Sequence, residues 1–219
     1  MGSLRSGALP TEFPVFPLSG AMLLPSGRLP LNIFEPRYLA MVEDALGEGR
    51  MVGMIQPDPI RPRTPAGPAL YRVGCLGRIT SFSETDDGRY LVTLAGVTRF
   101  AVAVELEMRR GYRRVRADLA RFAADLEPED GGGVDRSVLL AALRAYFAAR
   151  GFDANWDAIN EMPDGMLVAT LSMVCPFEPP EKQVLLEAGT VAERSRALLA
   201  LLQMGAHEVG AGEPGGPPS

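Results

Sequence analysis

The chain of 219 residues has few side chains that serve enzymes as bases or phosphate ligands, with one lysine, Lys182, and one histidine, His207. A P-loop requires Gly-Lys-Ser or Gly-Lys-Thr, but Lys182 lies between glutamate and glutamine. We expect Lys182 to pair with Glu178 or Glu181 on a helix, or to face solvent. A serine or cysteine nucleophile needs a positioned base. The sequence therefore predicts no Walker-type ATPase, no peptidase and no catalytic residues.

Metal ligands are also scarce. Cys75 and Cys175 lie far apart among apolar neighbours, and with one histidine they cannot build a closed zinc site. We therefore expect no metal and no cofactor, and both thiols to be small buried hydrophobes. The Asp-Asp-Gly sequence at 86–88 predicts a hairpin turn, and the acidic segment 125–130 predicts a solvated loop. No carboxylate pair stands out, although an enzyme with a carboxylate site remains an alternative.

No segment is apolar for long enough to cross a bilayer, because the longest uncharged apolar run is Met166–Cys175. The first dozen residues lack the apolar core of a secretory signal. They fit the myristoylation pattern, but no basic stretch follows as a second anchor. With 47% hydrophobic residues, 22% charged residues and a net charge of −5, the composition predicts a soluble, cytoplasmic protein without a membrane partner.

From Phe13 to Gln56, short apolar runs alternate with proline and glycine, which predicts strands separated by turns. The expected strands are Val15–Leu18, Ala21–Leu24, Leu29–Phe34 and Met51–Ile55. Between the last two, Pro36 suits the first turn of a helix, and Glu35 lies at the positive end of the helix dipole. Apolar residues at helical spacing follow, as far as Gly47.

The middle of the chain has the pattern of a small barrel. Residues 57–68 contain five prolines together with Arg61 and Arg63, a composition typical of an extended, exposed loop. Strands are expected at 90–94, at 100–106 and, as an edge strand, at 113–117. Glycines at 74, 77 and 96 favour bulges, and strands with such bulges favour a closed or nearly closed barrel.

From Asp135 the apolar spacing becomes helical. The expected helices are Val138–Phe147 with Gly151 as its stop, a short one capped by Asp153, Met166–Val174 after a Pro-Asp-Gly turn, Pro180–Ala188, and Val191–Met204 opened by a capping box of Thr190 and Glu193. Trp156 is expected in the core of this helical part, with ligand binding as the alternative. The Gly- and Pro-rich end predicts disorder.

These pieces, in this order, resemble the Lon N-terminal (Lon substrate-binding) domain family. The matching residues are Phe16-Pro17-Leu18, Leu24-Pro25, Pro30-Leu31, Phe34-Glu35-Pro36-Arg37-Tyr38, Gly53-Met54-Ile55-Gln56, 74–79, 94–100, Pro176-Phe177 and 181–187. The resemblance covers about residues 13 to 205 and implies an α+β fold, a PUA-like β pseudo-barrel followed by a C-terminal helical bundle. It also implies a chain without the ATPase and protease domains of full-length Lon proteases.

The domain organisation follows from the resemblance and the composition together. We expect a flexible leader at 1–12, a barrel subdomain at 13–125, a helical subdomain at 134–206 and a disordered tail at 207–219.

The resemblance implies a non-catalytic module that binds unfolded or partly unfolded protein segments, or an adaptor in proteolysis that works with a separate protease. We expect an apolar groove beside the first helix, with Met41 and Met51 in its lining, because methionine adapts to varied partners. The residues predicted to bind peptide are Phe34, Arg37, Tyr38, Met54 and Gln56. The alternative is that this set packs the helix on the barrel, with Arg37 and Gln56 as ties to a neighbouring strand.

RNA binding is the second hypothesis, because PUA-like barrels often contact RNA and arginines are frequent between 109 and 121. Arginine suits phosphate. The acidic segment that follows and the negative net charge oppose this interpretation, and Tyr112 is the sole aromatic residue among the arginines. We therefore expect nucleic acid not to be a partner.

Overall fold

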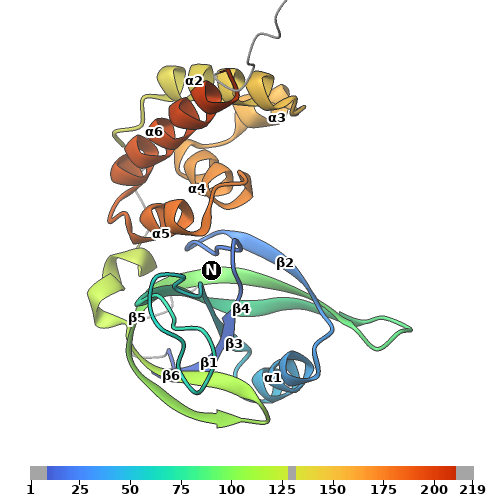
Figure 1. Cartoon of the computed structure of the whole chain (residues 1–219). Helices are drawn as coiled ribbons and strands as arrows, with labels where there is room; N and C mark the ends of the chain where they lie inside the picture. Colours follow the sequence, from blue (N-terminus) through green and yellow to red (C-terminus); the bar gives the residue numbers. More distant parts are fainter. Residues whose placement is uncertain (1–8, 128–131, 211–219) are drawn as a thin grey trace, which may run out of the picture. The chain divides into compact units, whose positions relative to one another are not determined.

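The computed structural model describes residues 9–127 and 132–210. Its contacts divide the chain into two compact units, Met1–Pro128 and Glu129–Ser219. The first unit contains the strands and the second is helical (Figure 1), which confirms the α+β prediction. Order begins before residue 13, because Leu9 is buried and the first strand starts at Glu12. Residues 1–8 of the expected leader and 211–219 of the expected tail lie outside the described residues.

The strands of the first unit form one barrel. They are β1 (Glu12–Pro17), β2 (Arg28–Ile33), β3 (Met51–Ile55), β4 (Val73–Glu84), β5 (Tyr90–Arg109) and β6 (Tyr112–Asp118). The sheet has the order β2-β5-β4-β3-β1-β6, and β6 also pairs with β5. This last pairing closes five of the strands into a ring, as the bulge-prone glycines predicted. Strands β1 and β3 run parallel, and the other pairs are antiparallel.

The longest strand, β5, spans twenty residues, where the sequence predicted two strands at 90–94 and 100–106. A register shift at Leu76/Gly77 takes up an extra residue near Gly96, so the chain bulges there without leaving the sheet. The first half of β5 pairs with β2 and β4, and the second half pairs with β6. Strand β6 was predicted at an edge, which is wrong, because it pairs with β1 and β5.

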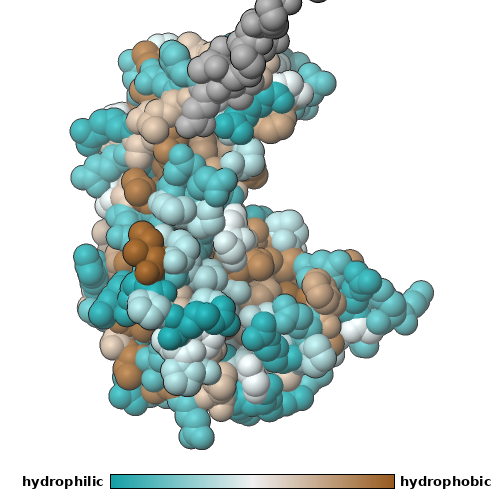
Figure 2. All heavy atoms as spheres, viewed as in Figure 1, coloured by the Kyte–Doolittle hydropathy of each residue, from teal (hydrophilic) through white to brown (hydrophobic). Residues whose placement is uncertain are grey.

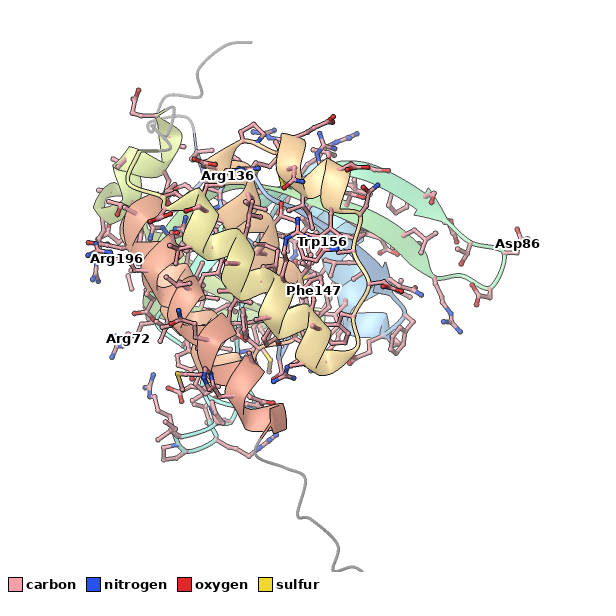
Figure 3. The ribbon with its side chains drawn as sticks, turned by 90° about the horizontal axis from the view of Figure 1, so that it is seen from above. Arg72, Asp86, Arg136, Phe147, Trp156 and Arg196 are labelled. Atoms are coloured by element: carbon pink, nitrogen blue, oxygen red, sulfur yellow. The ribbon has the colours of Figure 1, made fainter. Side chains whose placement is uncertain are left out.

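A three-stranded arm projects from the barrel (Figure 1), and we define it as residues 28–34, 80–84 and 90–95. Its β4–β5 turn carries the predicted Asp-Asp-Gly sequence, and Gly88 adopts the positive φ of 76° that such a turn requires. Asp86 lies at the tip (Figure 3).

The run Ala21–Leu24 was predicted as a strand, and this is wrong. Met22, Leu23 and Leu24 are buried, but this segment belongs to a loop that covers Gly77 and Gly96 of the barrel. The loop is joined to β5 by backbone bonds, because Ser26 donates to the Gly96 carbonyl at 3.0 Å. A buried apolar run without a sheet partner has the same composition as a core strand.

Helix α1 (Pro36–Gly47) begins as predicted, with Glu35 as its N-cap residue and proline in the first turn. After β6 the chain forms the 3-10 segment η2 (Ala120–Leu126). Here Asp125 was expected in a solvated loop, but it is buried and binds the Arg99 side chain. The described part of the acidic segment is therefore anchored to the barrel, and residues 128–130 lie outside the description.

The second unit consists of helices around an apolar core. They are α2 (Arg136–Arg150), α3 (Trp156–Glu161), α4 (Asp164–Val174), α5 (Pro179–Glu187) and α6 (Val191–Gly210). Leucines of α2, α4, α5 and α6 are fully buried. The predicted stop of α2 is confirmed, because Gly151 adopts a positive φ of 67°. The helix begins at Arg136, before the predicted run Val138–Phe147, and the Asp135 side chain caps it by accepting from the Val138 N–H.

Four details of the helical unit differ from the sequence predictions. Asn155, and not Asp153, caps α3, and α4 begins at Asp164, which was expected in a turn. Helix α6 continues through His207 to Gly210. Trp156 is half-exposed on α3, which has no buried residue. A short helix at the surface does not carry its aromatic residue into the core, although the apolar spacing is the same.

Lys182 and the cysteines are buried. The Lys182 ammonium donates to the Met173 carbonyl at 3.1 Å and the side chain is buried, so the expectation of a lysine on a solvated face is wrong. Burial lowers the pKa of Lys182 and raises the pKa of the Cys175 thiol to about 12. Cys75 and Cys175 are both free and buried, as predicted.

Candidate peptide-binding surface

Phe34 and Arg37 lie on the surface where β2 leads into α1. Phe34 is 62% exposed, and the Arg89 guanidinium from the β4–β5 turn lies 5.9 Å from the centre of its ring. Arg37 donates from Nε and Nη2 to Oε2 of Glu35, at 3.0 and 2.8 Å, and its guanidinium lies 4.5 Å from the centre of the Tyr38 ring. A partner could therefore reach both side chains without any movement of the barrel.

Tyr38, Met54 and Gln56, which were also predicted to bind peptide, are buried. The Tyr38 ring packs on Phe16, with 4.3 Å between centroids, and burial raises the pKa of its hydroxyl. The Gln56 side-chain oxygen accepts from the Gly20 N–H at 3.3 Å. The structure therefore does not bring the five predicted residues onto one surface. Tyr38, Met54 and Gln56 stabilise the barrel beneath it.

Met41 and Met51, expected in the groove lining, are also buried, at 1% and 3% exposure. The alternative prediction, that this set packs the first helix on the barrel, therefore agrees with the burial of both methionines and of the three buried site residues. Met51 belongs to the apolar core of the barrel, together with Ile55 and Phe100, and Met41 is one of the buried residues of α1.

The arm carries apolar side chains that the sequence prediction missed. Leu91 is 45% exposed and Phe82 is 40% exposed. Leu91 pairs with Asn32 of β2, and Phe34 lies two residues after Asn32. Arg89 lies two residues before Leu91, and its guanidinium lies over the Phe34 ring. Alternation along the strands therefore places Phe34, Arg89 and Leu91 on one face. We call these three residues the arm surface.

The opposite face of the arm is supported by the barrel. The Phe82 and Tyr90 rings meet edge to face at 5.0 Å, and the Tyr90 hydroxyl donates to Glu43 of α1 at 3.2 Å. In Figure 2 the tip of the arm is hydrophilic, and hydrophobic residues appear where the arm joins the barrel. In the sequence, Phe34 and Leu91 belong to two separate strand segments, and they become a candidate pair only when the register of β2 with β5 is known.

The charges beside the arm surface are paired locally. Arg89 Nε lies 2.8 Å from Oδ2 of Asp87, and Arg37 pairs with Glu35. Both pairs are exposed, so each contributes little to stability. The arm surface therefore has an apolar centre beside neutralised ion pairs, and it does not present a field of one sign.

The arginines at 109–116 are paired with carboxylates. Arg109 and Arg110 both contact Asp44, and Glu48 and Glu43 complete their pairs at 2.7 Å each. The remaining three arginines, Arg113, Arg114 and Arg116, pair with Glu105 or Glu12. The Asp44 carboxylate also accepts from the Tyr112 hydroxyl, and burial with this bond raises the pKa of Tyr112 to about 12. The stretch therefore ties β6 to its neighbours.

Within residues 9–127 and 132–210, no group of three or more histidine, cysteine, aspartate or glutamate side chains is placed to hold a metal ion. His207 is exposed on α6, and its Nδ1 lies 2.6 Å from the Gln203 carbonyl oxygen. Among the same described residues, no helix has the length and apolar character that a membrane span requires.

The fold combines a barrel closed by the β5–β6 pairing with an N-terminal βαβ segment and a following set of helices. This combination defines a class of substrate-binding domain. The model of the ATP-dependent protease La (LON) substrate-binding domain family matches residues 12–204. The chain belongs to this family, which confirms the resemblance found in the sequence.

Several Lon proteases are similar to the chain in sequence. Lon protease 2 of Sorangium cellulosum is 30% identical over 198 residues, which are 86% of the chain and 24% of that protein. Lon protease 2 of Thermus thermophilus is 24% identical over 202 residues, which are 89% of the chain and 24% of that protein. The chain thus spans at most about a quarter of the length of these relatives.

Two solved structures have the same fold. The Lon N-terminal domain protein from Xanthomonas campestris matches with a TM-score of 0.57 and 24% identity, over 86% of the chain and 97% of that structure. The N-terminal domain of Mycobacterium avium complex Lon protease matches with a TM-score of 0.60 and 17% identity, over 87% of the chain and 97% of that structure.

Proposed function

We propose that the chain is a recognition module for protein substrates and binds unfolded or apolar segments through its arm surface. The observation that carries the proposal is the exposure of Phe34 and Leu91 on one face of a sheet that is anchored to the barrel. Large apolar side chains on an exposed strand face are a recurrent feature of interaction sites. Membership of the substrate-binding family supports the same function.

Binding would proceed by burial of apolar side chains of the partner against Phe34 and Leu91. The arm has its strand pairs already formed and the Tyr90–Glu43 bond holds it to α1, so little conformational entropy is lost in the protein. The contacts are apolar and not directional, which favours tolerance of many sequences. Pro30 in the edge strand β2 lacks an N–H donor, so we do not expect the partner to extend the sheet.

Tyr38, Met54 and Gln56 have a supporting role in this proposal. They fix the start of α1 and the end of β3, and so the position of Phe34. Arg37 lies at the edge of the apolar surface, and its guanidinium can donate to a carbonyl or carboxylate of the bound segment after exchange with Glu35.

RNA is the weaker candidate. A phosphate-binding surface requires arginines that are available to phosphate, and those at 109–116 are paired with carboxylates. Replacement of these pairs by phosphate contacts would leave Glu43, Asp44 and Glu48 without their cations. Peptide binding requires no such exchange.

We further propose that the module is not itself an enzyme, acts in the cytoplasm and serves as an adaptor for a separate protease. The support for the first point is the placement of the available bases, because Lys182 is buried and His207 lies exposed on a helix. The support for the adaptor role is the family, in which the relatives are themselves proteases.

The proposal predicts that Phe34→Ala and Leu91→Ala each weaken the binding of an apolar peptide about tenfold, or about 1.4 kcal/mol. The measurement is fluorescence anisotropy of a labelled, unstructured peptide rich in leucine and phenylalanine. Binding should change little between 0.1 and 0.5 M salt, because apolar burial is not screened.

Met108→Ala is the matched control, since Met108 is 48% exposed at the other end of β5. Its affinity should equal that of the wild type, and thermal unfolding should show that all three variants remain folded. Equal affinities for all variants would place the site elsewhere, and affinity that falls steeply with salt would favour the arginine stretch.

A further inference from the structure

The loop between β3 and β4 displays a proline-rich ligand sequence. Residues 59–65 read Pro-Ile-Arg-Pro-Arg-Thr-Pro, which contains two overlapping Pro-x-x-Pro repeats. Such sequences favour the polyproline II conformation, which docks on aromatic side chains. Residues 59–63 are exposed, and Ile60 is 84% exposed, more than any other large apolar side chain of the described residues.

The loop is held at both ends, although its centre is open to water. The Asp58 N–H donates to the Ala69 carbonyl at 2.8 Å, and the Arg113 Nη1 donates to the Pro68 carbonyl at 2.6 Å. Near the tip, the Ile60 N–H donates to Oδ1 of Asp58 at 3.0 Å. A loop fixed in this way loses less entropy when it binds than a free peptide does.

The helical unit carries a surface that suits such a ligand. The Phe147 ring contacts Phe152 at 5.7 Å and Trp156 at 5.9 Å between centroids. Phe152 is 43% exposed, and Phe147 and Trp156 are half-buried. Figure 3 shows Phe147 and Trp156 beside each other on α2 and α3. We call these three residues the aromatic face.

The charges of the two surfaces are complementary. Residues 129–219 contain 6 basic and 13 acidic side chains, and the exposed carboxylates Asp153 and Asp157 lie next to Phe152 and Trp156 in sequence. The loop contributes Arg61 and Arg63, both exposed. The Trp156 ring already holds the guanidinium of Arg144 at 4.1 Å, the kind of contact that an incoming arginine would repeat.

We propose that the 57–68 loop of one copy docks on the aromatic face of a second copy. Ile60 and the neighbouring prolines cover the rings of the second copy, and Arg61 and Arg63 face its carboxylates. The contact joins two different surfaces, so repeated contacts form a ring or an open chain of copies. It is small, so its affinity is modest. This inference is independent of the peptide site on the arm.

The first test uses the single tryptophan, Trp156, as the reporter. Titration with a synthetic peptide of residues 57–68 should shift the tryptophan emission to shorter wavelength in a saturable way. A peptide with Ile60→Ser and with both arginines replaced by glutamate should bind at least about tenfold more weakly. No change in emission up to millimolar peptide would overturn the proposal.

The second test uses the full chain and light scattering. The average mass of the wild type should rise with concentration, whereas Ile60→Ser and Phe152→Ser variants should each stay monomeric. In a mixture of the two variants, the Phe152→Ser variant keeps an intact loop and the Ile60→Ser variant keeps an intact aromatic face. The mixture should therefore form dimers of one copy of each variant and no larger assembly. Ile60→Ser removes an exposed side chain and serves as the variant least able to disturb folding.

Three results would contradict the second copy as the occupant. The variants could associate as the wild type does, the mixture could remain monomeric, or the wild type could bind the peptide and yet stay monomeric at all concentrations. In the last case the aromatic face would belong to a proline-rich partner of another sequence.

Discussion

An Arg99→Ala variant is expected to lose about 3–5 kcal/mol of unfolding free energy, because it leaves the Asp125 carboxylate buried without its cation. Both side chains are almost inaccessible, at 4% and 8% exposure. Arg99 Nη2 donates to Asp125 Oδ1 at 2.7 Å, and the Arg99 backbone N–H donates to Oδ2 at 2.8 Å. The pair holds η2 against β5, so its loss should loosen the end of the barrel.

Urea unfolding followed by circular dichroism measures this loss. Arg116→Ala is the matched control, because its pair with Glu12 is largely exposed, and it should change stability by at most about 1 kcal/mol. The double variant Arg99→Met/Asp125→Leu should recover most of the loss, since no charge remains buried. A single Arg99→Ala variant as stable as Arg116→Ala would contradict this account of the pair.

A Gly96→Ala variant is expected to lose about 3 kcal/mol, because there is no space for a methyl group at this position. An added Cβ would lie 1.9 Å from the Leu24 carbonyl oxygen and 2.8 Å from its carbon. Both are backbone atoms of the 21–24 loop, and the loop is tied to β5 by the Ser26–Gly96 bond. Removal of this steric clash therefore requires a shift of the whole 21–24 loop.

Gly47→Ala provides the control for this substitution. Gly47 ends α1, and nothing lies within 4 Å of an added Cβ. The variant should therefore gain up to about 1 kcal/mol from the lower entropy of the unfolded chain. Thermal unfolding of both variants gives the comparison, and equal effects would show that the 21–24 loop adapts freely.

Local sequence signals predicted much of the fold. Pro36 and Glu35 marked the start of α1, Gly151 marked the end of α2, and the Asp-Asp-Gly turn marked the hairpin. Each of these signals acts within a few residues through capping or a required φ, so the sequence alone is sufficient to read it.

Features that depend on distant partners were missed. Ala21–Leu24 has the composition of a strand, but its place opposite Gly96 gives it no sheet partner. Asp125 lies in an acidic segment, and its burial depends on Arg99, twenty-six residues earlier. Strand β6 contains four charged residues and looks like an edge strand, but its arginines reach carboxylates on both sides.

The candidate site could be predicted only in part, because the exposure of its residues also depends on distant partners. The sequence identified the segment that contains Phe34 and Arg37, and the structure exposes both residues. It could not separate them from Tyr38, Met54 and Gln56, because exposure depends on how α1 lies on the barrel. Leu91 became a candidate only through its register with Asn32 of β2.

Site-specific photocrosslinking shows directly whether the arm surface contacts an unfolded protein. A photoreactive phenylalanine analogue replaces Phe34 in one protein and Met108 in another, and each is irradiated with a reduced, unfolded protein. The two positions are similarly exposed and lie far apart in the register of β5 and its neighbours. Recognition through the arm predicts strong crosslinking from position 34 and little from position 108. Equal yields at the two positions, or none at position 34, would contradict recognition through the arm.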